Sequence, residues 1–304
     1  MAINRSPLRT HEHKCFYKYV TAEVAKIALV NRTLRWSSPL IFNDPSDVLR
    51  EIEIEFKESE LQETVATEVA RIIENHELVP SSANPKLYLL LNILEIIGTQ
   101  ELRKLMVSEI RRFASEEHII NKGTISKLCT TWEQQIPQMR ILSLSEVNDN
   151  MAMWWHYADK HKGVVLELEC IDEIDSPWLV AKPVVYQETL PMFPTKEDLV
   201  RSITGLRPID YKQLFSEFMY IKKNDWAYEK EWRVVSFARP GESGVYSDYS
   251  VNSLNFGAIY FGKDVREDDE KDIIALLTHD LSHMSAYKAV HNSVKRCLQF
   301  NIVR

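Results

Sequence analysis

The sequence predicts an α+β fold, in which a β-sheet is interrupted by helices without the strict alternation of a doubly wound protein. Two observations carry this prediction. Segments with strand character cluster near the start of the chain, over 15–45, and again from residue 140 onward. Between them, over 55–135, apolar residues recur at helical spacing and no segment alternates as a strand does. We therefore expect one α+β domain over 1–304, with 55–135 as a helical insertion or subdomain.

The first elements follow from local patterns. The segment CFYKYV (15–20) is rich in β-prone residues, and TAEVAKIALVN (21–31) begins with a Thr that can cap a helix. The segment TLRWSSPLIFNDPSD (33–47) predicts a short strand that ends in Pro and Asn-Asp-Pro, which are typical of turns. Helices are then expected over 60–79, 85–117 and 124–136. The stretch LYLLLNILEII (87–97) is apolar on almost every side, which predicts deep burial or pairing with another chain.

Strand patterns return in the second half of the chain. Strands are expected at RILSLSE (140–146), VVLELE (164–169), KPVVYQ (182–187), WAYEKEWRVV (226–235) and NFGAIYFG (255–262). Helices are expected over 196–206, 210–223 and 266–281, and one or two closing strands over 285–303.

Composition excludes several classes of protein. The net charge of −7 disfavours a protein whose main task is to grip a nucleic-acid backbone. No apolar run approaches the roughly 20 residues of a membrane span, and the N-terminal residues lack the apolar core of a secretion signal. We therefore expect a cytoplasmic protein with no membrane contact. Its four Cys residues are far apart and form no CxxC motif, so reduced thiols are expected and no metal site is predicted.

The segment WAYEKEWRVV has an unusual charge pattern for a strand. Alternation would place Glu229, Glu231 and Arg233 on one face and Tyr228 on the other. Like charges on one strand face repel, so we expect the two carboxylates to face a polar cleft, where their repulsion raises one pKa. The alternative is an ion pair on a solvated strand, which contributes little to stability.

Three further polar and aromatic clusters are candidate site segments: Tyr17 to Tyr19, Trp36 to Pro45, and Asp149 to Ala158. Each also has an ordinary structural explanation. Asn43 and Asp44 suit a turn on propensity alone, the tyrosines suit packing, and His156 among large aromatics suits a buried core position. Functional residues nevertheless gather on loops held by strands, so these segments remain candidates.

In that order, FYKYV, LRWSSPLIFNDPSD, DNMAMWWHYADKHKGVVLEL and WAYEKEWRVV resemble an uncharacterised bacterial family of unknown function (DUF2971). Members share an aromatic-Lys/Arg-Tyr start, an FNDP turn, an MWxHYA segment and a WxYExExR strand. The resemblance extends over about 15–300. It departs in the long helical insert and at Ser46, where an aromatic residue is typical.

A second resemblance, to ADP-ribosyltransferases, implies a reaction. In that fold a split sheet, mixed or antiparallel, lines one NAD pocket with three separate strands, and a late strand carries a catalytic Glu, often as E-x-E. Here YKY, RWSSP and EKE follow that order, although the usual Arg or His is absent from the first strand. The resemblance implies Glu231 as the catalytic carboxylate and Glu229 as its helper. His156 is a further catalytic candidate. The implied NAD-binding residues are Tyr19, Lys18, Ser37, Asn43, Asp44, Tyr228 and Arg233.

Three functions are therefore expected from the sequence. The first is an enzyme that cleaves NAD or transfers ADP-ribose to a protein or nucleic-acid acceptor, as a toxin-like effector in antiphage defence. The second is a metal-dependent nuclease that uses Asp44, Glu229 and Glu231 with Lys230 or Lys223. The third is a non-catalytic sensor whose helical insert binds a regulator or a second copy of the chain.

Overall fold

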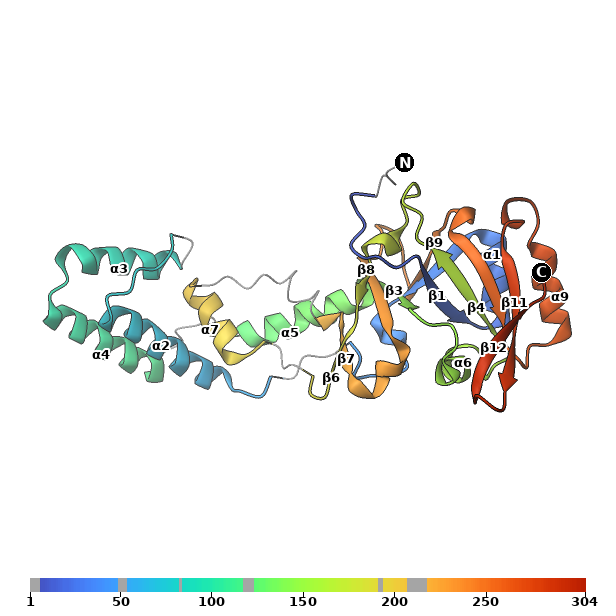
Figure 1. Cartoon of the computed structure of the whole chain (residues 1–304). Helices are drawn as coiled ribbons and strands as arrows, with labels where there is room; N and C mark the ends of the chain where they lie inside the picture. The colour runs from blue at the N-terminus through green and yellow to red at the C-terminus, as the bar shows by residue number, and fades with distance from the viewer. Residues whose placement is uncertain (1–5, 49–53, 82–83, 117–122, 191–193, 207–217) are drawn as a thin grey trace. The chain divides into compact units, whose positions relative to one another are not determined.

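The computed structural model describes residues 6–48, 54–81, 84–116, 123–190, 194–206 and 218–304. It contains helices and a mixed sheet, which confirms the α+β class (Figure 1). The chain divides into two compact units. The first comprises Met1–Arg50, Ile136–Leu190 and Phe218–Arg304, and the second Glu51–Gln135 with Pro191–Glu217. The expected helical segment 55–135 lies in the second unit, together with a later stretch that the sequence did not group with it.

The first unit is built on a sheet with the strand order β12-β11-β10-β4-β1-β3-β2-β9, in which β8 pairs with β3 and β5. Most neighbours are antiparallel, whereas β10 and β11 are parallel, so the sheet is mixed. The strands are β1 (Cys15–Val20), β2 (Thr33–Ser37), β3 (Met139–Ser145), β4 (Val164–Glu169), β5 (Lys182–Pro183), β8 (Glu231–Phe237), β9 (Tyr246–Ser250), β10 (Phe256–Phe261), β11 (Ser285–Asn292) and β12 (Cys297–Ile302). A separate parallel pair is formed by β6 (Val185–Gln187) and β7 (Ile221–Lys223).

Helices cover both faces of this sheet, which explains why β4 begins with three consecutive buried apolar residues, Val164 to Leu166. On one face, Leu166 packs in a core with residues of α1 (Ala22–Asn31) and α9 (Glu267–Leu276). On the other, Val165 packs with Trp154 of α6 (Met151–Tyr157). As expected, α1 starts at the Thr21 cap, whose side chain accepts a hydrogen bond from the Val24 amide.

The sheet is incomplete along one edge of β3. On one side β3 pairs with β8 over its whole length, from Met139 opposite Phe237 to Ser145 opposite Glu231. On the other side, β1 reaches only Ser145 and β2 reaches only Ile141. In the described register Ser143, between these two contacts, has a strand partner in β8 alone. The strands β1 and β2 therefore diverge and leave an opening in the sheet at the middle of β3.

The expected strand over 226–235 is wrong in its first half. Asn224–Glu229 forms 3₁₀ turns, Lys230 adopts a left-handed backbone with φ of 43°, and strand β8 begins only at Glu231. Glu229 and Glu231 therefore do not lie on one strand, and strand alternation does not explain why their side chains lie close together. The helix expected over 210–223 is also wrong at its end, since 221–223 forms β7, while 210–217 lies outside the described residues.

The regular elements in the described part of the second unit are all helices. Its helices are α2 (Glu58–Glu74), α3 (Pro85–Ile97), α4 (Gln100–Glu116), α5 (Thr124–Gln135) and α7 (Lys196–Thr204). Helix α3 buries Leu87 and Leu94, whereas Leu89, Ile96 and Ile97 are 61%, 81% and 64% exposed. Deep burial of 87–97 is therefore wrong for most of its side chains, and the expected role in binding another chain stays a prediction.

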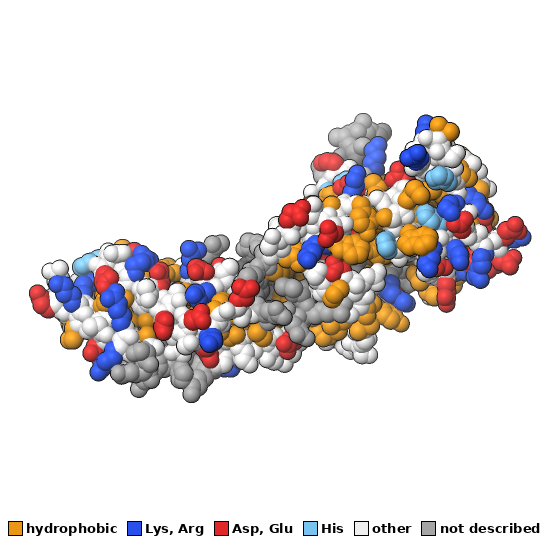
Figure 2. All heavy atoms as spheres, turned by 90° about the horizontal axis from the view of Figure 1, so that it is seen from below, with side chains coloured by type: hydrophobic (Ala, Val, Ile, Leu, Met, Phe, Trp, Pro, Cys, Tyr) orange, Lys and Arg blue, Asp and Glu red, His pale blue; other side chains and the backbone are white. Residues whose placement is uncertain are grey.

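Surface charges of both signs are interspersed on the face drawn in Figure 2. Among the helices in the described ranges, none has the length and apolar character that crossing a membrane requires.

Gly262 lies where β10 meets the turn after α6, and its replacement by Ala should destabilise the protein. An added Cβ would lie 2.0 Å from the His161 carbonyl oxygen and 3.0 Å from that of Gly163. Because the Gly262 amide also donates to the Gly163 oxygen at 2.9 Å, the two backbones cannot separate freely. We expect a loss of about 1–3 kcal/mol in the free energy of unfolding, measured by urea denaturation. The neighbouring Lys263→Ala, which removes only an exposed ion pair, is the control; equal effects would contradict the prediction.

Candidate active site

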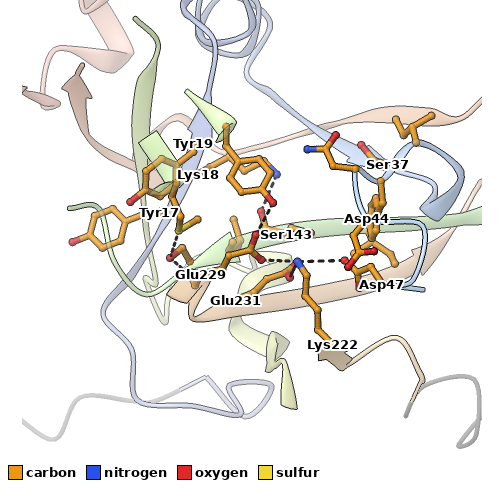
Figure 3. A pocket seen from close by; sticks show the side chains of 18 residues that line it. Tyr17, Lys18, Tyr19, Ser37, Asp44, Asp47, Ser143, Lys222, Glu229 and Glu231 are labelled. Carbon is orange, nitrogen blue, oxygen red and sulfur yellow. Dashed lines mark hydrogen bonds and ion pairs between the residues drawn. The ribbon is translucent and has the colours of Figure 1, made fainter. Parts of the chain in front are cut away.

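A pocket of about 210 Å³ lies at the opening in the sheet of the first unit (Figure 3). Its walls come from β1, β2, the turn after β2, β3, α6, β7 and the start of β8. The lining residues are Tyr17, Lys18, Tyr19, Ser37, Ile41, Phe42, Asn43, Asp44, Asp47, Ile141, Ser143, Leu144, Ser145, Met153, Tyr157, Lys222, Glu229 and Glu231.

A network of buried charges forms one wall of the pocket. The Lys222 ammonium lies 2.5 Å from Glu229, 3.1 Å from Glu231 and 3.4 Å from Asp47. Arg233, which is fully buried, donates to both oxygens of Glu231 and to both oxygens of Asp47. Two cations thus compensate three carboxylates, which is the condition under which charges tolerate burial.

Glu231 is held as an anion. Arg233 donates to its two carboxylate oxygens at 2.7 and 2.8 Å, and Lys222 adds a third contact. Burial alone would raise the pKa of Glu231, but Arg233 and Lys222 outweigh burial and hold that pKa well below its usual range. The Tyr186 hydroxyl, which accepts from the Glu231 amide at 2.8 Å, also fixes its backbone.

The pKa of Glu229 is shifted in the opposite direction, above its usual value. Its carboxylate accepts from the Tyr157 hydroxyl and from Lys222, each at 2.5 Å. Burial raises the pKa of Glu229, and the charge of Glu231 adds to the rise, while Lys222 and Tyr157 offset only part of it. Two adjacent carboxylates with opposite pKa shifts are the usual arrangement for separate acid–base and electrostatic roles.

Lys18 extends from β1 into the opening of the sheet. Its ammonium donates to the Ser143 carbonyl oxygen at 2.8 Å (Figure 3). Burial lowers the pKa of Lys18 to about 8, although Glu231 acts in the opposite direction.

The turn after β2 forms the rim of the pocket. Asp44 accepts hydrogen bonds from the amide and hydroxyl of Ser46 at 2.8 and 2.7 Å, which closes the expected turn. Although partial burial raises its pKa, these hydrogen bonds leave the pKa of Asp44 below its usual value. Asn43 is exposed and Ser37 half-buried, so both are accessible to a ligand.

Residues 153–234 match the model of a family described as protein of unknown function (DUF2971). This segment of the chain is therefore similar to the DUF2971 family. The predicted resemblance to this family is thereby confirmed over 153–234. The individual motifs, of which FYKYV and FNDP lie outside the match, stay predictions. The matched segment contains most of α6, from Met153 onward, together with Lys222 and both pocket glutamates. No curated protein and no solved structure matches the chain.

Most of the residues selected from the sequence meet at this pocket, although the DUF2971 segment supplies only two of them. Those that line it are Tyr19, Lys18, Ser37, Asn43, Asp44, Glu229 and Glu231. The Tyr19 hydroxyl donates to the Val147 carbonyl at 2.8 Å, and this hydrogen bond between two distant segments stabilises the fold.

Three selected residues do not line the pocket. Arg233 lies behind Glu231 and has no exposed surface, so it supports the site from within the protein. His156 is exposed on α6, and not buried among the aromatics as the core interpretation expected. Tyr228 lies in the 3₁₀ segment, where its carbonyl accepts from the Asn150 side chain at 3.1 Å.

Sequence reasoning missed Lys222, Asp47, Tyr157 and Ser143 as site residues. Tyr157 follows His156 inside the candidate segment Asp149 to Ala158, whereas Asp47 lies two residues beyond the candidate segment that ends at Pro45. Lys222 adjoins Lys223, which the nuclease hypothesis named, but its segment was expected to be helical. Ser143 carries no sequence signal, because its position in the opening depends on the register of three strands.

Proposed function

We propose that this pocket binds NAD and that the protein cleaves the bond between nicotinamide and ribose. The ADP-ribosyl group would then pass to water or to an acceptor. The observation that supports this most is the pair of buried carboxylates, Glu229 and Glu231, with opposite pKa shifts in one accessible pocket.

The proposed chemistry uses the two carboxylates differently. Cleavage of the glycosidic bond passes through a ribose that carries positive charge, as in sugar hydrolysis. A carboxylate that is already ionised and rigidly held stabilises this charge without reorganising, and Glu231 has these properties. Glu229, with a raised pKa, is suited to accept the proton of the incoming water or acceptor hydroxyl.

The remaining walls suit the other parts of a dinucleotide. The rings of Phe42 and Tyr157 offer apolar surfaces against which the nicotinamide can pack. Ser37, Asn43 and Asp44 at the rim supply hydroxyl, amide and carboxylate groups for the ribose hydroxyls. In a cell, such an activity would deplete NAD or modify a protein or nucleic acid, which is the behaviour of a toxin-like effector.

The nuclease alternative draws no support from the arrangement of these charges. The nuclease hypothesis assigns a divalent cation to Asp44, Glu229 and Glu231, but Glu229 and Glu231 already share the Lys222 ammonium at 2.5 and 3.1 Å. Among the described residues no group of three or more His, Cys, Asp or Glu side chains is arranged to hold a metal.

The proposal predicts that the purified protein releases nicotinamide from NAD and that Glu231→Gln slows this release by about 100-fold or more. Release is measured by chromatography, and NAD binding by the shift in melting temperature. Glu173→Gln, an exposed carboxylate of the same unit, is the matched control and should retain full activity. Because Glu231→Gln weakens the contacts of Arg233, circular dichroism must show that the variant is folded.

A second variant, Ser37→Ala, changes the pocket without touching the charge network and should weaken NAD binding. Failure of the wild type to bind or cleave NAD would refute the proposal.

A further inference from the structure

Lys18 occupies an unusual position in the sheet. Ser145 of β3 pairs with Tyr17 and Ile141 pairs with Ser37, so the backbone of Ser143 has no strand neighbour on that side in the described register. The Ser143 carbonyl therefore points into the opening, and the Lys18 side chain reaches it at 2.8 Å. The amine is consequently fixed at the pocket wall by one hydrogen bond to a rigid strand (Figure 3).

The two lysines of the pocket differ in how their charge is compensated. Lys222 holds Asp47, Glu229 and Glu231, and these carboxylates raise its pKa although burial alone would lower it. Arg233 shares two of the same carboxylates. Among the described residues Lys18 has no ion pair within the range of a salt bridge, because the nearby carboxylates are already engaged.

This difference leaves Lys18 partly uncharged near neutral pH. With a pKa of about 8, roughly a tenth of the amine is neutral at pH 7, against less than a thousandth for an ordinary lysine. A lysine that binds phosphate works best as a permanently charged ammonium. Lys18, with its lowered pKa, suits that role less well. Desolvated lysines of this kind are the amines that form covalent intermediates with carbonyl carbons.

We propose that Lys18 is a nucleophilic amine that bonds covalently to the anomeric carbon of the substrate sugar and holds it as an imine. This inference rests on the proposed NAD cleavage and extends it to the fate of the ADP-ribosyl group. It assigns to the pocket a second class of ligand, namely sugars with a free aldehyde, of which ADP-ribose in its open-chain form is one.

The step balances with water as the only other reactant. The lone pair of the neutral amine forms a bond to C1′ as the bond from C1′ to nicotinamide breaks, and nicotinamide leaves with that electron pair. The new secondary ammonium loses a proton to Glu229. The ring bond from C1′ to O4′ then opens, O4′ takes its electron pair and a proton, and a C=N bond forms. Water adds to this imine, which releases ADP-ribose and restores the Lys18 amine.

Reductive trapping tests the inference directly. The full chain is incubated with ADP-ribose or with NAD in the presence of cyanoborohydride, and adducts are located by intact mass and peptide mapping. We expect Lys18 to be labelled by ADP-ribose roughly tenfold or more faster than Lys14, an exposed lysine just before β1. Labelling should rise with pH through about 8. Lys18→Arg keeps a donor for Ser143 but cannot form an imine, so it should lose the adduct, whereas Lys14→Arg should keep it.

The two incubations, one with ADP-ribose and one with NAD, separate this inference from the proposed function. Labelling spread evenly over exposed lysines, or an unchanged adduct in Lys18→Arg, would overturn the role of Lys18. If the wild type releases nicotinamide but forms no adduct at Lys18, the inference fails while NAD cleavage stands. If ADP-ribose labels Lys18 but NAD is not cleaved, the reactive amine stands and the proposed function fails.

Discussion

Arg233→Ala is expected to lower the free energy of unfolding by about 3–5 kcal/mol, because it leaves buried carboxylates without their main counter-charge. Arg233 has no exposed surface and donates to Glu231, to Asp47 and to the Met219 carbonyl. Its removal also creates a cavity beside strand β8. Urea denaturation of the wild type and the variant, followed by circular dichroism, measures the difference.

Comparing Arg233→Ala with Arg35→Ala separates the effect of burial on stability from the effect of an ion pair alone. Arg35 also donates two hydrogen bonds to one carboxylate, that of Asp248, but this pair is partly exposed, so Arg35→Ala should cost less than about 1 kcal/mol. In a double-mutant cycle, Asp47→Ala should cost less in the Arg233→Ala background than in the wild type, because the uncompensated carboxylate is then gone. A similar, small loss for Arg233→Ala and Arg35→Ala would show that the buried network does not stabilise the fold as described.

Glu229→Gln is expected to lower kcat/KM for nicotinamide release by about 10²–10⁴-fold, the usual effect of losing a general base. The sign of the pH dependence follows from its raised pKa. A base works when deprotonated, so the wild-type rate should fall as the pH drops through the pKa of Glu229, at a higher pH than an ordinary glutamate would give. In Glu229→Gln this acid limb should disappear. The profile is measured from initial rates over a series of buffers.

Tyr157→Phe is the companion variant for this experiment. The Tyr157 hydroxyl donates to Glu229 at 2.5 Å and lowers the pKa of that carboxyl. Its removal should therefore move the acid limb to higher pH while the rate at the optimum changes less than in Glu229→Gln. An acid limb that persists in Glu229→Gln would assign the base to another group.

Much of the first unit could be predicted from its sequence because the signals are local. The Thr21 cap and the helical spacing after it predict α1, and the largely apolar segment 164–169 predicts a strand. The family resemblance pointed to a segment that contains both pocket glutamates. The candidate residues on β1, β2 and the following turn also line the pocket, since loops and strand ends commonly carry ligand contacts.

Glu229 and Glu231 do lie together, but not through the local structure that their spacing predicts. Strand alternation was expected to place them on one face, but Glu229 ends a 3₁₀ segment and Lys230 turns the chain before β8 starts. Their side chains converge because both contact the Lys222 ammonium. Single-sequence periodicity could not show this, since a tertiary contact with another segment overrides the local preference.

The sequence by itself determined the α+β class, most of the sheet elements, the similarity of the 153–234 segment to a family and the residue types available for chemistry. Tertiary structure alone decided that β1 and β2 diverge along β3, which opens the sheet beside Ser143. It also decided which cation compensates which carboxylate, and so gave Lys18 and Lys222 opposite pKa shifts. The physical reason is that hydrogen-bond propensity and hydrophobic spacing act between near neighbours in the chain. Desolvation and charge pairing instead depend on the distances between segments that are far apart in the sequence.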